Sequence, residues 1–226
     1  MADQLAYHGT SYEVVEQEPP ELLGRNLISA SYLLAGATAF FFISFVFAYF
    51  YLRSLNNGDM WKPGNVDTSV GWGTAVVACY VASALIVRLG LNAHRSLRRD
   101  RWRVLGLVAL GIGVVGLVLQ VIAWTQQGFG PADGGFASVY FGWTAFLFLF
   151  VLGTLVWLEM TVATSIRYRN VPSGPEPGDA SGDPHRTAHD IREPLSLVRA
   201  ELVGLSFFWT FLAAIAVVSW VILYLI

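Results

Sequence analysis

The sequence predicts an all-α membrane protein, a polytopic bundle of five transmembrane helices. Hydrophobic residues make up 55% of the 226-residue chain and charged residues only 13%, whereas soluble domains carry about a quarter charged residues. Five apolar runs are each about as long as, or longer than, the roughly 20 residues that a helix needs to cross a bilayer core. A net charge of -2 gives no reason to expect a nucleic-acid partner.

The first two predicted spans are separated by a loop. Residues 1–27 are polar and acidic and lack the apolar core of a signal peptide, so we expect a cytoplasmic N-terminal tail. The membrane domain then covers residues 28–226 and opens with a span at 28–52. Asn, Gly and Pro residues between positions 56 and 64 favour turns and predict an outer loop. The second span follows at 71–91.

The third span, 104–124, comes after a short turn, which predicts an antiparallel helical hairpin with the second span. Small residues and one glutamine recur along it at intervals of three or four: Ala109, Gly113, Gly116 and Gln120. Residues at these intervals share one helix face. Because lipid tails give no hydrophobic drive between helices, a face of small residues predicts a helix contact.

The fourth and fifth spans are predicted at 138–162 and 200–225. The connection between them includes residues 171–193, which are rich in Pro, Gly, Asp and Ser. That composition predicts a flexible inner loop.

Basic residues predict how the chain is oriented. Six arginines lie in or next to the turn between the second and third spans: Arg88, Arg95, Arg98, Arg99, Arg101 and Arg103. The turn at 125–137 contains no Lys or Arg. Because cytoplasmic loops carry the excess of basic residues, the N-terminus is predicted inside and the C-terminus outside. Arginine also far outnumbers lysine, which favours a GC-rich genome and a bacterial plasma membrane.

Polar residues inside the predicted spans are few. Gln120 is expected to bond to a neighbouring helix. Glu159 and Glu201 lie near the predicted inner ends and are the other candidates for interhelical polar contacts, with Glu159 either solvated or paired with Arg167 or Arg199. All four histidines fall outside the spans. The sequence therefore predicts no metal site and no catalytic residue in this chain.

Five stretches occur in the order found in a known family. They are Phe45–Arg53 (FVFAYFYLR), Trp61–Asp67 (WKPGNVD), Leu117–Trp124 (LVLQVIAW), Ser138–Val151 (SVYFGWTAFLFLFV) and Phe208–Leu225. Together they resemble subunit III of haem-copper cytochrome c oxidases, in its short five-helix bacterial form.

Several polar positions of that family carry other residues here. The family's buried glutamate aligns with Thr38, and its two histidines align with Leu147 and Phe150. In the last helix Thr210 and Ala213 replace a histidine and an aspartate. The resemblance thus implies the scaffold and the docking role, without the family's tuning of proton uptake.

The resemblance implies a non-catalytic subunit of a respiratory terminal oxidase that reduces oxygen with electrons from cytochrome c or a similar donor. Haem and copper are expected in the partner subunits I and II and not in this chain, and phospholipid is expected between the helices. The residues expected at the subunit I interface are Phe41, Phe45, Tyr49, Thr144 and Phe146. The candidates for lipid headgroup contacts are Arg53, Arg95, Arg98 and Arg99.

Two alternatives stay open. The lost glutamate and histidines favour the subunit-III-like accessory protein of nitric oxide reductases. A small stand-alone transporter would carry inverted repeats, broken helices or a polar cluster at the midplane. The sequence displays none of these transporter features.

Overall fold

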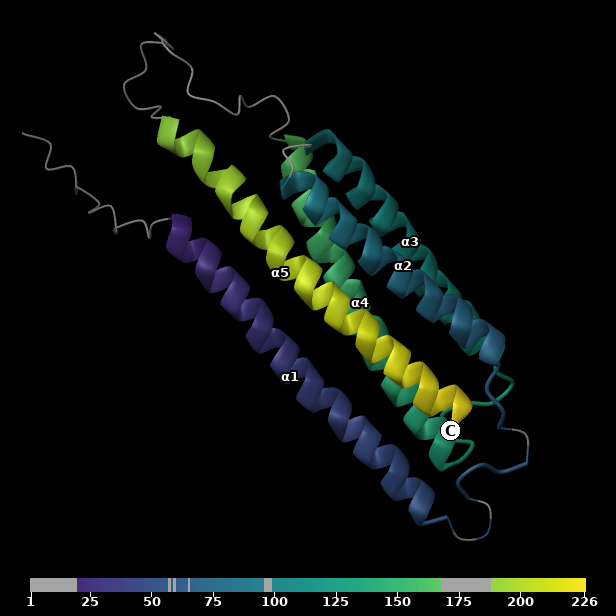
Figure 1. Cartoon of the computed structure of the whole chain (residues 1–226). Helices are drawn as coiled ribbons and strands as arrows, with labels where there is room; N and C mark the ends of the chain where they lie inside the picture. The colour runs from purple at the N-terminus through teal and green to yellow at the C-terminus, as the bar shows by residue number, and fades with distance from the viewer. Residues whose placement is uncertain (1–19, 57, 59, 65, 96–98, 168–187) are drawn as a thin grey trace, which may run out of the picture.

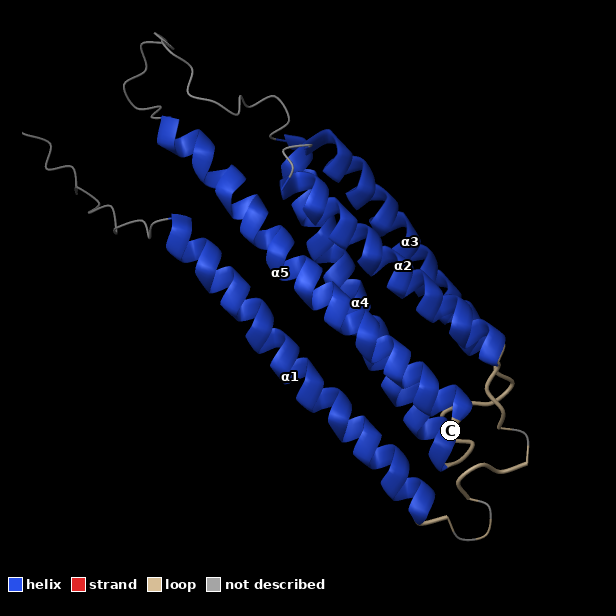
Figure 2. Cartoon of the chain, viewed as in Figure 1, coloured by secondary structure: helices blue, strands red, loops and turns tan. Residues whose placement is uncertain are grey.

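Five long helices make up most of the described chain. The computed structural model describes residues 20–56, 58, 60–64, 66–95, 99–167 and 188–226. The elements, in chain order, are α1 (Pro20–Ser54), α2 (Val70–Arg95), α3 (Arg99–Thr125), α4 (Gly135–Arg167), α5 (Ala188–Trp220) and a π-helical turn, η1 (Val221–Leu225), that continues α5. These ranges contain no strand (Figure 2). The predicted all-α class is confirmed.

Each of the five helices is long and apolar enough to cross a membrane. The candidate spans are Leu22–Ser54, Val70–His94, Asp100–Thr125, Gly135–Arg167 and Val198–Leu225. Along the middle of each span the backbone hydrogen bonds run within the helix, as a bilayer core requires. The molecule is therefore a multi-pass helical bundle of the predicted kind.

Two helices begin earlier than the sequence predicts. Helix α1 begins at Pro20 rather than near residue 28, and α5 begins at Ala188 rather than near residue 200. Residues 188–193, predicted as part of a flexible loop, are helical. Hydropathy marks only the part of a helix that crosses hydrocarbon, while the helix itself continues into polar sequence. Proline at the first helical position of α1 fits this start. Residues 1–19 and 171–187 lie outside the described residues.

The helices form a bundle with α5 near its centre. Figure 1 shows α1 along one side, next to α5, and the α2–α3 hairpin on the opposite side. Helix α5 packs against α1, α2 and α4, whereas α1 packs against α5 and α4. Within the candidate spans, 44% of the α5 window is buried but only 22% of the α1 window. Helix α1 is thus the peripheral member.

Small residues allow α2 and α3 to approach closely. A Cβ atom added to Gly116 would lie 2.7 Å from the Tyr80 ring, and one added to Gly113 would lie 2.5 Å from Leu155 of α4. Ala109 on the same face is fully buried. The predicted helix contact along this face and the predicted antiparallel hairpin are both confirmed.

The loop between α1 and α2 packs against the start of α4. The backbone N–H of Gly135 donates to the Met60 carbonyl at 3.1 Å, and that of Phe136 donates to the Trp61 carbonyl at 2.9 Å. The first N–H groups of a helix have no partner inside it, so the loop supplies their acceptors. Gly134 has a φ of 118° and lies against Pro63, where a side chain would be strained.

Candidate functional site

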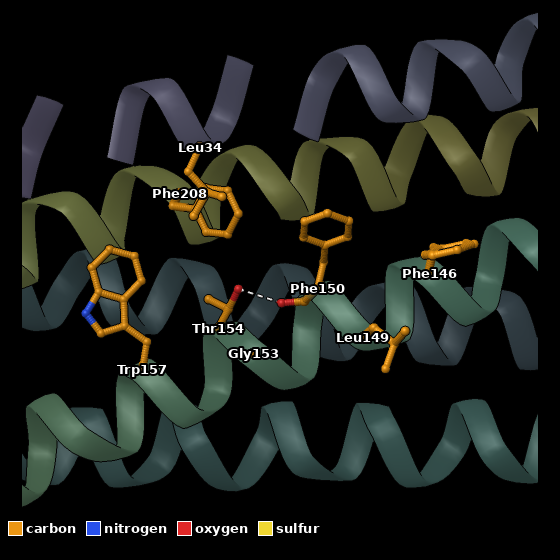
Figure 3. Close-up of a pocket in the computed structure, with 8 residues that line it drawn as sticks. All are labelled: Leu34, Phe146, Leu149, Phe150, Gly153, Thr154, Trp157 and Phe208. Atoms are coloured by element: carbon orange, nitrogen blue, oxygen red, sulfur yellow. Dashed lines mark hydrogen bonds between the residues drawn. The ribbon is translucent and has the colours of Figure 1, made fainter. Parts of the chain in front are cut away.

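An apolar groove lies between α1, α4 and α5 (Figure 3). Its volume is about 470 Å³, within the usual range for small-molecule sites. Most of its wall comes from α4, and one residue each comes from α1 and α5. The lining residues are Leu34, Phe146, Leu149, Phe150, Gly153, Thr154, Trp157 and Phe208.

One glycine and one aromatic ring shape this groove. A Cβ atom added to Gly153 would meet nothing within 4 Å, so the groove is open above this position of α4. Figure 3 shows Phe150 pointing from α4 toward α5, with Leu34 and Phe208 lying above the α4 ribbon. The sequence separation of these residues means that the groove exists only once α1 and α5 have packed on α4.

The chemistry of the groove is mostly hydrocarbon. The hydroxyl of Thr154 donates to the Phe150 carbonyl of its own helix at 2.8 Å, so it is already bonded. Most of the other lining groups are aliphatic or aromatic. Burying an unpaired polar group against such a surface is costly, so the groove suits an apolar chain better than a polar ligand.

Aromatic rings join α1 to α4 next to the groove. The ring centroids of Phe41 and Phe146 are 4.8 Å apart, and those of Phe45 and Phe146 are 5.8 Å apart. Phe45 also packs against Trp143 at 5.9 Å. These three phenylalanines, expected from the sequence at a subunit interface, are thus brought together within the chain. Phe146 still exposes 42% of its surface.

Two other residues of the expected interface are buried inside the chain. Tyr49 is only 2% exposed and packs against the rings of Trp61 and Phe136. Thr144 is 4% exposed; its hydroxyl accepts a hydrogen bond from the Trp124 indole at 2.9 Å and donates to a backbone carbonyl. This packing leaves Tyr49 and Thr144 almost no surface to offer a partner.

The four arginines expected at lipid headgroups are described to different extents. Arg53 donates from Nη1 to the Ile226 carbonyl at 2.9 Å, which ties the end of α1 to the residue after η1. Arg95 and Arg99 lie at the facing ends of α2 and α3, with side chains outside the described part of the structure. Arg98 lies outside the described residues altogether.

The three polar span residues have different surroundings. Gln120 of α3 is buried, and its Nε2 has no hydrogen-bond partner among the described residues. Glu159 is exposed on α4 and forms no ion pair within the described ranges. Glu201 is half-buried near the start of the α5 span.

Sequence reasoning missed the pairs of tryptophan and hydroxyl that link the helices. Trp143 of α4 donates to the Ser219 hydroxyl of α5 at 2.8 Å, and Trp209 of α5 donates to the Ser83 hydroxyl of α2 at 3.1 Å. A buried indole N–H needs an acceptor, and that need can be read from composition. The particular serine cannot, because it depends on which helices are neighbours.

One buried arginine was also missed. Arg103 is 9% exposed and donates to Asp100 at 2.7 Å and to the Ser165 carbonyl of α4 at 3.0 Å. The sequence groups it with the basic inner turn. The three-residue spacing from Asp100 is the one signal that sets it apart.

The fold and the groove define a class: a multi-pass helical membrane protein with an apolar groove between α1, α4 and α5. Among the described residues, no three His, Cys, Asp or Glu side chains gather in a way that would hold a metal ion. No protein-family model matches this chain. No curated protein matches it either.

Proposed function

We propose that this chain is subunit III of a respiratory haem-copper terminal oxidase of the cytochrome c oxidase type. In this role it has no redox chemistry of its own. It packs beside subunit I, and near subunit II, and holds phospholipid at the edge of the complex. Oxygen reduction takes place at haem and copper in the partner subunits, which no residue of this chain is proposed to bind.

The observation that carries the proposal is that the family-like stretches meet one another in space. Tyr49, from the first stretch, packs against Trp61, from the second, with ring centroids 5.2 Å apart. Trp124, from the third, donates to Thr144 of the fourth. Stretches that resemble one family in order and also contact one another are what a shared scaffold requires.

The last stretch belongs to the same set of contacts. Trp209, in the Phe-Trp-x-Phe pattern of α5, donates to Ser83 of α2, and Tyr224 bonds to Tyr140 of α4 with their hydroxyl oxygens 2.9 Å apart. The resemblance therefore falls on residues that join helices.

The groove between α1, α4 and α5 supports the proposed lipid-holding role. Its lining is hydrocarbon, and its volume of about 470 Å³ suits part of an acyl chain. In a bilayer such a groove faces lipid tails directly. Phe146 both lines it and lies partly exposed, so we propose that this residue contributes to the boundary with subunit I.

The proposed location is a bacterial plasma membrane, with the N-terminal side of α1 in the cytoplasm and η1 on the outside. The arginine-rich connection between α2 and α3 supports this orientation. The same positive charges support the inward position of this connection and its proposed contacts with lipid headgroups.

A second candidate is the subunit-III-like accessory protein of a nitric oxide reductase. It is favoured by three positions at which the oxidase family carries a glutamate or a histidine and this chain does not. Thr38 bonds only to the Leu34 carbonyl of its own helix among the described residues, and Leu147 and Phe150 are apolar. None of the three offers the carboxylate or imidazole of the oxidase family.

One purification tests both candidates. The tagged chain is isolated from its own membranes in mild detergent, and its partners are identified by mass spectrometry and an absorption spectrum. A haem-copper subunit I with oxygen-reducing activity is the expected result. A nitric oxide reductase partner would establish the second candidate, and recovery of the chain with no partner would refute both.

A further inference from the structure

A second, much smaller cavity lies inside the bundle, between α2, α3, α4 and the end of α5. Its volume is about 20 Å³, and about 10–15 Å³ is enough for one water molecule. Its wall includes several hydrogen-bonding side chains. Those used below are Tyr80, Gln120, Thr144, Ser219, Trp220 and Tyr224.

Three residues that line this cavity each have a buried polar atom with no hydrogen-bond partner among the described residues: Tyr80 Oη, Gln120 Nε2 and Trp220 Nε1. Tyr80 is 1% exposed and Gln120 is 4% exposed. Trp220 is half-buried, but its indole nitrogen is covered. A buried donor or acceptor without a partner loses its hydration and gains nothing in return. Three such atoms from three helices around one cavity point to a shared partner.

We propose that this cavity binds one ordered water molecule that bridges α2, α3 and α5. Water has two lone pairs and two protons, which matches the groups present. Its oxygen accepts hydrogen bonds from Gln120 Nε2 and Trp220 Nε1, and one of its O–H groups donates a hydrogen bond to Tyr80 Oη. Its second O–H group can donate to the hydroxyl oxygen of Thr144, Ser219 or Tyr224, each of which lines the cavity.

The chemistry of the wall favours water over an ion. No side chain with a formal charge lines the cavity. Two of the three unpartnered atoms are N–H donors, which repel a cation. An anion would be buried without a counter-charge, which is costly inside a protein. A neutral molecule that both donates and accepts meets all three groups.

Solid-state NMR on the ¹⁵N-tryptophan-labelled protein in lipid tests the proposal directly. Magnetisation is transferred from water protons to the indole N–H groups. The Trp220 indole is expected to receive it strongly. Trp209 serves as the internal control, because its indole donates directly to Ser83, which does not line the cavity. Its signal is expected to receive little.

Variants separate the cavity from the membrane surface as the source of that water. Tyr80→Phe combined with Gln120→Met removes two of the three proposed partners while keeping the side-chain volumes. The transfer to Trp220 is then expected to be lost, while an unchanged Trp209 signal shows that the bundle is folded. If the double variant does not fold, Tyr80→Phe alone is expected to weaken the transfer.

Three results would overturn the proposal. One is a Trp220 signal that receives no more transfer than Trp209 does. Another is transfer that persists fully in the double variant, since the water would then come from the bilayer surface. The third is a Trp220 resonance that shifts when chloride is exchanged for a larger anion, which would assign the cavity to a halide.

Discussion

Trp209 of α5 and Ser83 of α2 form a relay that reaches a third helix. The Trp209 indole donates to the Ser83 hydroxyl at 3.1 Å, and that hydroxyl donates to the Ala109 carbonyl of α3 at 2.7 Å. Both side chains are fully buried. One serine oxygen thus joins three helices at a depth where water cannot replace either bond.

Ser83→Ala is therefore expected to destabilise the bundle. The change leaves the Trp209 N–H buried without an acceptor, which costs about 1–3 kcal/mol. Thermal unfolding in mild detergent, followed by tryptophan fluorescence, measures the effect. Ser44→Ala is the matched control, because the Ser44 hydroxyl is exposed and bonds only within α1. Equal midpoints for the two variants would contradict the relay.

Gly116→Ala is expected to weaken the α2–α3 contact. The new Cβ would lie 2.7 Å from the Tyr80 ring and 3.1 Å from the Cys79 Cβ, neither of which is a flexible chain end. Overpacking of this kind costs about 1–3 kcal/mol. The same unfolding measurement detects it.

Gly111→Ala provides the comparison on the same helix. A Cβ at that position meets nothing within 4 Å, so only helix propensity acts, and it favours alanine by up to about 1 kcal/mol. A lower stability for Gly111→Ala than for Gly116→Ala would show that the packing face has been assigned wrongly.

Gly153→Leu is expected to reduce the phospholipid that purifies with the protein. A leucine side chain would occupy the open space above Gly153 in the groove. Native mass spectrometry of the detergent-purified protein counts bound lipids. Gly111→Leu adds the same side chain on an exposed part of α3 and is expected to leave the count unchanged. Equal lipid in both variants would remove the groove as a lipid site.

Gly134→Ala is expected to loosen the loop between α1 and α2 from α4. Its φ of 118° is strained for any other residue, and a Cβ would lie 2.6 Å from Pro63 and 3.1 Å from the Met60 carbonyl. Faster proteolysis between residues 55 and 70 is the measurement. Gly130→Ala, with a nearest neighbour at 3.7 Å, is the control. A cleavage rate unchanged from the parent protein would contradict the assigned role.

Hydropathy, turn length and the spacing of small residues predicted much of this fold. The five spans and the hairpin follow from apolar length and short turns, and Gly113 and Gly116 mark the α2–α3–α4 contact because only small residues allow it. The start of α5 was predicted too late because helix formation does not stop where apolar sequence stops.

The candidate site was much less accessible to sequence reasoning. The groove forms because Leu34 of α1 and Phe208 of α5 both pack near α4. No local sequence pattern predicts that residues so far apart in the chain will meet. Tyr49 and Thr144 were expected at the subunit I interface because the family resemblance led us to place the first and fourth spans there. Loop packing against α4 and the Trp124 bond bury them instead.

The contact between α1 and α5 has a consequence for how the protein is made. These two helices are the farthest apart in the described sequence, yet they lie along one another. During synthesis α1 is completed well before α5, because more than a hundred residues separate the end of α1 from the start of α5. Until α5 arrives, α1 has only α4 to pack against, and its surface that later contacts α5 stays uncovered.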